Sequence, residues 1–254
     1  RDSSVTGVQT CALPICLTEE SWRVMAELGE LGGDNWFSLG DRDLATHLYR
    51  SQRLSQGATK SLVTSEIAAR RGLGLAILPA SDDPVATILD TEIGELTFQS
   101  YFVQHHHSVT TQSIRYEGAA TARPSDAALT ALRTAERIII APSNPVLSIE
   151  PILAIPGFRD ILVARRDHVT AISPFVGGSA LKGPADRLMN ELGFGASNVG
   201  IAKYYADYVS TLVIDEVDSA DMREVEAAGV SVRVTTTVMA DPAHADQLVR
   251  TVLA

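Results

Sequence analysis

The chain has 254 residues, of which 45% are hydrophobic and 20% charged, as expected for one large globular domain or two small ones. Its net charge is −10 and its isoelectric point is about 5.0, which disfavours nucleic acid and anionic membranes as partners. A small phosphorylated ligand remains compatible, because backbone N–H groups bind anions locally. No apolar run approaches the roughly 20 residues of a membrane span, and no secretory signal is visible, so we expect a cytoplasmic protein.

Residues 1–16 differ from the rest of the chain. They show neither helical nor strand periodicity, and they resemble translated sequencing-adapter sequence. Cys11 and Cys16 lie here, and no second Cys or His pair completes a metal site at a usual spacing. We therefore predict a non-native or disordered leader, followed by a single α/β domain over 17–254.

The periodicity predicts alternating helices and strands along that domain. Taken in chain order, we expect helices at 18–31 (N-cap Thr18), 44–54 (N-cap Asp43) and 60–70, a strand at 75–78, a strand pair at 96–103 and 113–116 within a side element around 94–120, a helix at 126–136, strands at 137–141 and 169–173, helices at 184–192 and 199–208, a strand at 212–214, a helix at 219–228, a strand at 230–235 and a helix at 243–253. Strands separated by helices predict a mostly parallel sheet with helices on both faces.

Ligands of open α/β sheets bind at the carboxyl ends of the strands. The predicted strand 137–141 is followed by Ser143 and Asn144 between two prolines, and a short helix is expected at 147–153. The side chains of Ser143 and Asn144 can contact a phosphate or a base, and an N-capped turn without ligand contacts is equally compatible.

The segment 174–184, PFVGGSALKGP, follows the next strand. Its glycines permit positive φ or close backbone approach, and Lys182 supplies a positive charge. It is not a P-loop, because G-x-x-x-x-G-K-[ST] is absent. The alternative is a flexible loop with a solvated lysine.

Acidic residues mark two further positions. Asp41, Arg42 and Asp43 form the segment GDRD, in which the carboxylates can hold a metal and Arg42 can clamp an anionic or planar ligand. Asp82 and Asp83 precede a proline. The alternatives are an N-cap with a surface ion pair for the first group and an Asx turn for the second.

The run His105–His107 predicts an exposed polar tip, since consecutive strand residues face opposite sides and cannot all bind one metal. No G-x-S-x-G motif is present, and no Ser/His/Asp arrangement follows from the spacing.

Four segments, GDRDLATH (40–47), LPASDDPV (78–85), IAPSNPVLSIEPILAIPG (140–157) and SPFVGGSALKGPA (173–185), together resemble the 2-phospho-L-lactate transferase family of deazaflavin coenzyme (F420) biosynthesis. The resemblance runs from about residue 17 to the C-terminus. It implies a Rossmann-like fold with a small side element, a homodimer, and transfer of a phospholactyl or phosphoenolpyruvyl group from a guanosine diphosphate-activated donor to a deazaflavin, with release of GMP.

The resemblance also implies site roles and a Mg²⁺ ion. Arg42, with Asp41 and Asp43 beside it, corresponds to the deazaflavin side, and Ser143 and Asn144 to the nucleotide side. Asp82 and Asp83 correspond to an acidic turn near the metal, and Lys182 to a Gly-rich loop facing the cleft.

Departures from the family pattern occur at Thr236, at Lys203–Tyr205 and at Glu150. The family's N-terminal Gly-rich loop is also missing, so we expect this chain to lack about a quarter of the enzyme and to be inactive. The competing hypothesis is a non-catalytic nucleotide-sugar-binding regulator of the same superfamily. A hydrolase or phosphatase would need a nucleophile or a complete metal cluster, and the sequence shows neither.

Overall fold

The computed structural model describes residues 20–253, so the predicted leader, its two cysteines and the Thr18 N-cap lie outside the described residues. The chain divides into two compact units. One contains the described residues up to Pro79 together with Gln99–Ser108, and the other contains Ala80–Phe98 and the chain from Val109 onward.

Helices make up the regular structure of the first unit: α3 Arg23–Glu30, α4 Asp41–Ser55, α5 Lys60–Arg70 and the π-helix η1 Ser100–Gln104. The predicted helix 60–70 is confirmed. Thr59 caps it, because its side chain accepts a hydrogen bond from Leu62 N at 3.2 Å. An ion pair between Arg53 Nη2 and Glu66 Oε1, 2.7 Å apart, joins α4 to α5.

Two sequence predictions in this unit are wrong. Helix α4 begins at Asp41 with Gly40 as N-cap, so Asp43 lies inside the first turn and does not cap the helix. A Cβ at residue 40 would lie 2.0 Å from Glu20 Cγ, so the flexible Glu20 side chain would have to move to admit one. The strand predicted at 75–78 is an irregular segment whose Leu75, Ile77 and Leu78 are exposed. An apolar run without a hydrogen-bonded neighbour does not form a strand.

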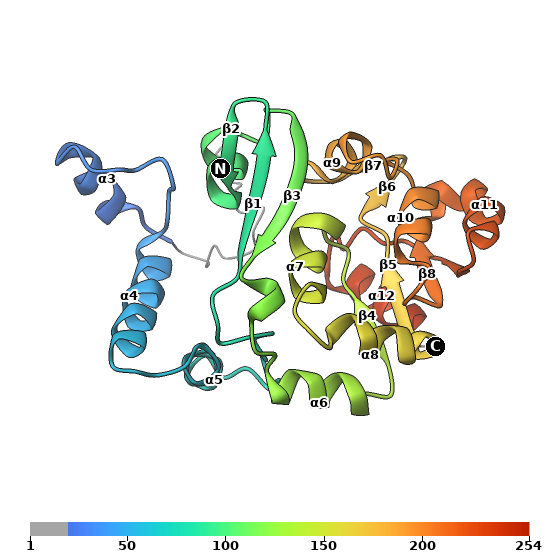
Figure 1. Cartoon of the computed structure of the whole chain (residues 1–254), viewed down its shortest axis with the longest axis horizontal. Coiled ribbons are helices and arrows are strands. Elements are labelled where there is room, and N and C mark those ends of the chain that lie inside the picture. The colour runs from blue at the N-terminus through green and yellow to red at the C-terminus, as the bar shows by residue number, and fades with distance from the viewer. Residues whose placement is uncertain (1–19, 254) are drawn as a thin grey trace. The chain divides into compact units, whose positions relative to one another are not determined.

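The second unit contains the parallel sheet (Figure 1). Its strands are β4 Ile138–Ile140, β5 Val169–Ile172, β8 Thr211–Ile214 and β9 Ser231–Val234, in the order β4-β5-β8-β9. All three pairings are parallel, with Ile138 opposite Val169, Thr170 opposite Thr211, and Thr211 opposite Ser231. The sequence prediction of a mostly parallel sheet is therefore confirmed.

Both faces of this sheet are covered. Consecutive strand residues point to opposite faces, and Leu212, Val213 and Ile214 are all 0% exposed. On one face, Leu248 and Val252 of helix α12 pack in a buried cluster with Ile172 and Val213. These two helix residues are four positions apart, which places them on one side of α12.

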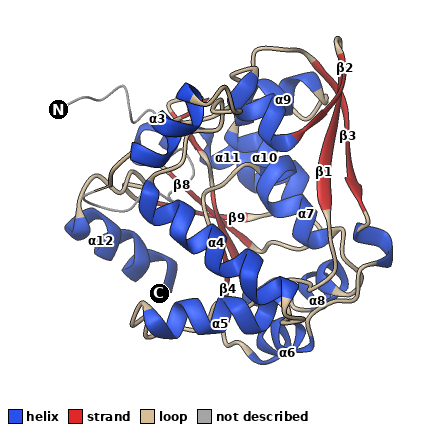
Figure 2. Cartoon of the chain, turned by 90° about the vertical axis from the view of Figure 1, so that its left-hand side faces the viewer, coloured by secondary structure: helices blue, strands red, loops and turns tan. Residues whose placement is uncertain are grey.

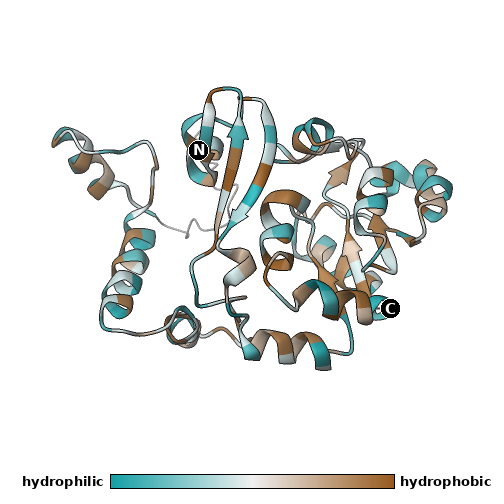
Figure 3. Cartoon of the chain, in the orientation of Figure 1, coloured by the Kyte–Doolittle hydropathy of each residue, from teal (hydrophilic) through white to brown (hydrophobic). Residues whose placement is uncertain are grey.

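The remaining elements of the second unit connect and flank these strands. They are η2 Ala119–Thr121, α6 Asp126–Thr134, η3 Pro145–Ile149, α7 Glu150–Leu153, α8 Phe158–Ala164, η4 Arg166–His168, β6 Phe175–Val176, β7 Ser179–Ala180, α9 Ala185–Glu191, α10 Asn198–Tyr205, η5 Glu216–Asp221, α11 Met222–Ala227 and α12 Pro242–Leu253. Helix α6 alternates apolar and polar colours in Figure 3, as an amphipathic helix does, and its Ala128 and Leu129 are buried.

A separate antiparallel sheet stands beside the parallel one (Figures 1 and 2). Its strands are β1 Ala86–Thr91, β2 Gly94–Thr97 and β3 Thr111–Glu117, in the order β2-β1-β3. The strand predicted at 96–103 ends at Thr97, because the chain then turns into η1, and β1 was not predicted at all. The architecture is α/β and Rossmann-like. Within residues 20–253, no helix is both long and apolar enough to cross a bilayer.

Candidate functional site

Polar side chains follow the carboxyl end of each of the four parallel strands. Ser143 and Asn144 come after β4, Ser173 after β5, Asp215 after β8 and Thr235 after β9. Because the carboxyl ends of parallel strands share one edge of the sheet, these side chains line the edge at which α/β proteins bind ligands.

Asn144 is fixed in its turn. Its Oδ1 accepts hydrogen bonds from Val146 N and Leu147 N, both at 3.0 Å, and so caps the π-helix η3. The capping interpretation is confirmed. The amide nitrogen Nδ2 is buried and has no hydrogen-bond partner among the described residues. A buried unpaired donor is costly, so this atom is suited to an acceptor on a ligand.

Asp215 ties two strand ends together. Its Oδ2 accepts hydrogen bonds from Thr237 N at 2.7 Å and Thr237 Oγ1 at 2.9 Å, and its Oδ1 accepts one from Val217 N at 3.2 Å. Burial alone would raise the pKa of Asp215, but the hydrogen bonds from Thr237 and Val217 outweigh it and leave the pKa below its ordinary value. The group is therefore a carboxylate near neutral pH.

Ser173 begins a second buried chain of hydrogen bonds. Its Oγ donates to Asn198 Oδ1 at 2.6 Å and accepts from Phe175 N at 3.2 Å. Asn198 Nδ2 in turn donates to Asp221 Oδ2 at 3.0 Å. Ser173 and Asn198 are 2% and 1% exposed, so this network fixes the start of the segment that follows β5.

That segment forms a short hairpin, β6–β7, which the sequence did not predict. Gly177 and Gly178 form its two-residue turn with φ of 63° and 78°, so of the two roles that the sequence left open for these glycines, positive φ is the one observed. Gly177 N donates to Asp218 Oδ2 at 3.0 Å. Lys182 follows the hairpin and is exposed.

A network of polar and aromatic residues contacts the segment that follows the Asn144 turn. Glu150, the first residue of α7, forms an ion pair with Arg159 of α8 and accepts a hydrogen bond from Tyr204 of α10 at 3.0 Å. Tyr116 of β3 donates to Val146 O at 2.6 Å. Burial and the neighbouring Glu150 carboxylate raise the pKa of Tyr204, so its hydroxyl remains a proton donor. Glu150 and Tyr204, which departed from the family pattern, thus support α7.

The segment GDRD lies in the first unit. The Asp41 carboxylate accepts from Ser21 Oγ at 2.6 Å and from Val24 N at 3.1 Å, which stabilises the start of α3, and the Ser21 hydrogen bond lowers the pKa of Asp41. Asp43 is buried, and this burial raises its pKa. Arg42 is exposed, and its backbone N donates to Glu20 Oε1 at 2.9 Å. These three residues and the polar sheet edge belong to different units.

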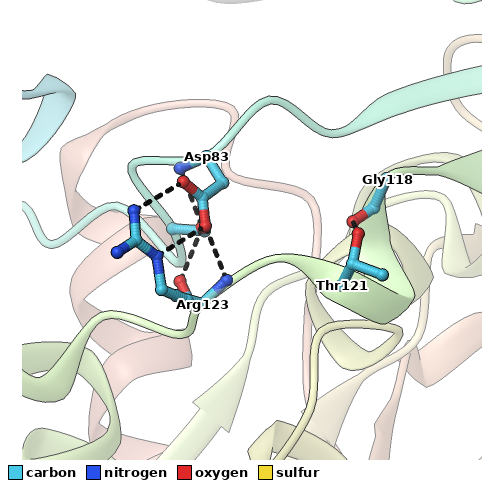
Figure 4. A network of polar contacts seen from close by, with 5 residues as sticks. Asp83, Gly118, Thr121 and Arg123 are labelled. Carbon is cyan, nitrogen blue, oxygen red and sulfur yellow. Dashed lines mark hydrogen bonds and ion pairs between the residues drawn. The ribbon is translucent and has the colours of Figure 1, made fainter.

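Asp82 and Asp83 lie in the second unit, before β1. Asp83 Oδ2 accepts from Arg123 N at 2.8 Å and Asp83 Oδ1 pairs with Arg123 Nη2 at 3.2 Å (Figure 4). Asp83 N donates to Ser81 Oγ at 3.0 Å. Arg123 thus neutralises Asp83, and Asp82 is the exposed carboxylate of the pair.

Residues 20–253 contain no group of three or more His, Cys, Asp or Glu side chains arranged to hold a metal ion. The histidine run ends the π-helix η1, with φ of 49° at His106 and 44° at His107. Left-handed backbone of this kind is typical of a tight turn.

Sequence reasoning missed Ser173 and Asp215 at the polar sheet edge and the residues that hold this edge in place, namely Asn198, Asp218 and Thr237. For Ser173 and Asp215 a signal was available, because each is the first residue after a parallel strand. For Asn198 and Asp218 no local signal exists, since their partners lie 25 and 41 positions away in the chain.

Relatives of known name resemble the chain over most of its length. It is 39% identical over 242 residues to the phosphoenolpyruvate transferase of Kitasatospora aureofaciens, covering 93% of this chain and 75% of that protein. It is 37% identical over 221 residues to the 2-phospho-L-lactate transferase of Methanococcoides burtonii, covering 87% and 72% of the respective chains.

The fold resembles that of protein BH3568 from Bacillus halodurans, with a TM-score of 0.59 at 16% identity, covering 82% of this chain and 71% of that one. The model of the family described as 2-phospho-L-lactate transferase CofD matches residues 7–253. With this match and the identities to both transferases, the chain belongs to the 2-phospho-L-lactate transferase CofD family.

Proposed function

We propose that this protein transfers a phospholactyl or phosphoenolpyruvyl group from a guanosine diphosphate-activated donor to the terminal hydroxyl of 7,8-didemethyl-8-hydroxy-5-deazariboflavin. The observation that carries the proposal is the row of polar side chains at the carboxyl edge of the parallel sheet, in a chain of this family. GMP is released, and the product is a precursor of coenzyme F420.

The proposed reaction requires positioning rather than a protein nucleophile. The acceptor hydroxyl oxygen forms a bond to the phosphorus that carries the lactyl or enolpyruvyl group, and the bond from that phosphorus to the GMP oxygen breaks. The hydroxyl proton is released. Such a transfer depends on in-line placement and on neutralising the phosphate charges. Asp215 is engaged by Thr237 and has a lowered pKa, so we assign it to holding the site together.

The donor's anionic groups are assigned to the Ser143–Asn144 turn and to Lys182. The unpaired Asn144 Nδ2 supports a hydrogen bond to a ligand oxygen, and exposed Lys182 supplies the positive charge. Arg42, with Asp41 and Asp43 beside it, is assigned to the deazaflavin.

Magnesium is part of the proposal, with Asp82 and Asp83 as its protein contacts. Mg²⁺ needs only one or two protein carboxylates when substrate phosphates complete its coordination, and it would neutralise charge on those phosphates. Arg123 pairs with Asp83 and also interacts with Asp82, so the metal would compete with this guanidinium. A homodimer and a cytoplasmic location also stay predictions.

The test is GMP release by the full gene product, supplied with the guanosine diphosphate-activated donor and Mg²⁺, with and without the deazaflavin. We expect release that depends on the acceptor and stops with EDTA. A folded protein that leaves the donor intact when the acceptor is present contradicts the transferase. Equal affinity for a uridine diphosphosugar and for GDP supports the regulator instead.

A residue-level test compares Lys182→Ala with Arg223→Ala, which removes the same charge from an exposed position on α11. We expect Lys182→Ala to raise the KM for the donor about tenfold, the size of one charged hydrogen bond. Arg223→Ala should leave KM unchanged. Equal KM values for the two variants would remove Lys182 from the donor site.

A further inference from the structure

The β6–β7 hairpin is too small to be stable by itself. Only Phe175 with Ala180 and Val176 with Ser179 are paired, and isolated two-stranded hairpins are marginal even when longer. The hairpin follows β5 within three residues and leads to Lys182. Its position at the polar sheet edge must therefore be set by contacts with other parts of the second unit.

The first contacts hold the base of the hairpin. Phe175 is 0% exposed, and its backbone N donates to Ser173 Oγ, which the Asn198–Asp221 pair fixes in turn. These contacts fix residues 173–175 and leave the glycine turn to be held separately.

Asp218 of η5 holds the turn itself. In a two-residue hairpin the ladder does not use the N–H of the first turn residue, which here is Gly177. Asp218 Oδ2 accepts this N–H at 3.0 Å, and Asp218 is only 8% exposed. A buried carboxylate that accepts a backbone N–H makes a strong, charge-assisted hydrogen bond. A neutral side chain without an acceptor would leave a turn N–H unpaired.

Asp218 also connects the hairpin to Asp215. Its backbone N donates to Asp215 O at 3.0 Å, and the Asp215 carboxylate accepts hydrogen bonds from Thr237, which follows β9 in the chain. The hairpin after β5, the turn after β8 and the loop after β9 are therefore joined through two aspartates three positions apart.

We propose that Asp218 is a positioning residue for the donor site, which fixes the glycine turn of the β6–β7 hairpin and thereby the approach of Lys182 to the donor's phosphates. The hydrogen bond from Gly177 N to Asp218 Oδ2 is termed the clamp. The role in donor binding rests on the proposed function, whereas the clamp does not. Loss of the clamp weakens ground-state binding of the donor, so KM rises more than kcat falls.

The first experiment measures hydrogen exchange of residues 174–182 in the ligand-free chain by mass spectrometry. Asp218→Ala removes the acceptor and is expected to speed exchange in this segment about tenfold. Asp218→Asn keeps a neutral, weaker acceptor and should give about a threefold change. Asp246→Ala, which breaks an exposed pair with Arg250 on α12, should give none.

Exchange in Asp218→Asn equal to that of the wild type overturns the clamp, even if Asp218→Ala does not fold. This readout uses no substrate, so it stands whether or not the protein is a transferase.

The second experiment measures the KM and kcat for the guanosine diphosphate-activated donor in the same variants of the full gene product. We expect the donor KM to rise about tenfold in Asp218→Ala and less in Asp218→Asn, with kcat within about twofold of the wild type. Faster exchange with an unchanged donor KM overturns the positioning role. If no transfer is observed with the wild type, the proposed function fails, and the affinity for GDP, measured by calorimetry, replaces KM as the readout.

Discussion

The Asp215 carboxylate accepts two hydrogen bonds from Thr237, one from the backbone N at 2.7 Å and one from Oγ1 at 2.9 Å. Asp215 follows β8 and Thr237 lies beyond the end of β9, so one buried side chain joins the ends of neighbouring parallel strands. The contact spans 22 residues of sequence and fixes the backbone at the polar sheet edge.

Replacing Asp215 by alanine should destabilise the protein markedly. The buried backbone N–H of Thr237 and the part-buried N–H of Val217 would lose their acceptor, and we expect the free energy of unfolding to fall by about 3 kcal/mol. Thr237→Val removes only the hydroxyl contact and should cost about 1 kcal/mol. Urea unfolding at pH 7 measures both. A smaller loss for Asp215→Ala than for Thr237→Val would contradict this account.

The contribution of Asp215 should depend on pH. Its folded-state pKa lies below the ordinary value of 3.8, so its carboxylate stabilises the fold above that value. The stabilisation is lost as pH falls below about 4 through the folded-state pKa. The stability difference between the wild type and Asp215→Asn, measured by urea unfolding, should therefore be constant from pH 7 to 5 and shrink towards pH 3. A stability difference that grows as the pH falls would contradict a lowered folded-state pKa for Asp215.

The ion pairs of Glu150 and Asp246 should contribute unequally to the free energy of unfolding. In the Glu150–Arg159 pair the side chains are 17% and 40% exposed, whereas in the Asp246–Arg250 pair they are 59% and 78% exposed. Glu150→Ala leaves Arg159 and the Tyr204 hydroxyl without this partner, and should cost about 2 kcal/mol. Asp246→Ala should cost less than about 0.5 kcal/mol, because water screens the pair.

Thermal unfolding of the two variants, monitored by circular dichroism, compares these costs. Equal melting temperatures would show that Glu150 does not support α7.

Gly118 should tolerate alanine less well than Gly229. Both have positive φ, 81° and 94°, so alanine strains the backbone at either position by about 1 kcal/mol. At Gly118 the added Cβ would also lie 2.6 Å from Pro84 O, whereas Gly229 faces open space. We expect a total loss of about 3 kcal/mol for Gly118→Ala. Chemical denaturation checks this, and equal losses would rule out the close approach to Pro84.

The strands with strong local patterns were predictable. Ile138–Ile140 and Val169–Ile172 are short β-branched runs between helices, and the structure pairs them in parallel. The 75–78 run shows the limit of that reasoning. It is equally apolar, yet no neighbouring strand pairs with it, and pairing is a property of distant chain segments. Strand β1 was missed for the converse reason, because β2 and β3 pair on either side of it and stabilise a segment with weak local preference.

In the candidate site, the sequence indicated the family, a turn at Ser143–Asn144 and glycines able to adopt positive φ, since each depends on residues that are close together in the chain. The hydrogen bonds of Asp215 with Thr237 and of Asp218 with Gly177, and the pairing of Asp83 with Arg123, emerged only from the folded chain. Each of these carboxylates accepts hydrogen bonds from residues 22 to 41 positions away. The physical reason is that a carboxylate withdrawn from water takes whichever donors folding brings to it, and local spacing does not encode that choice.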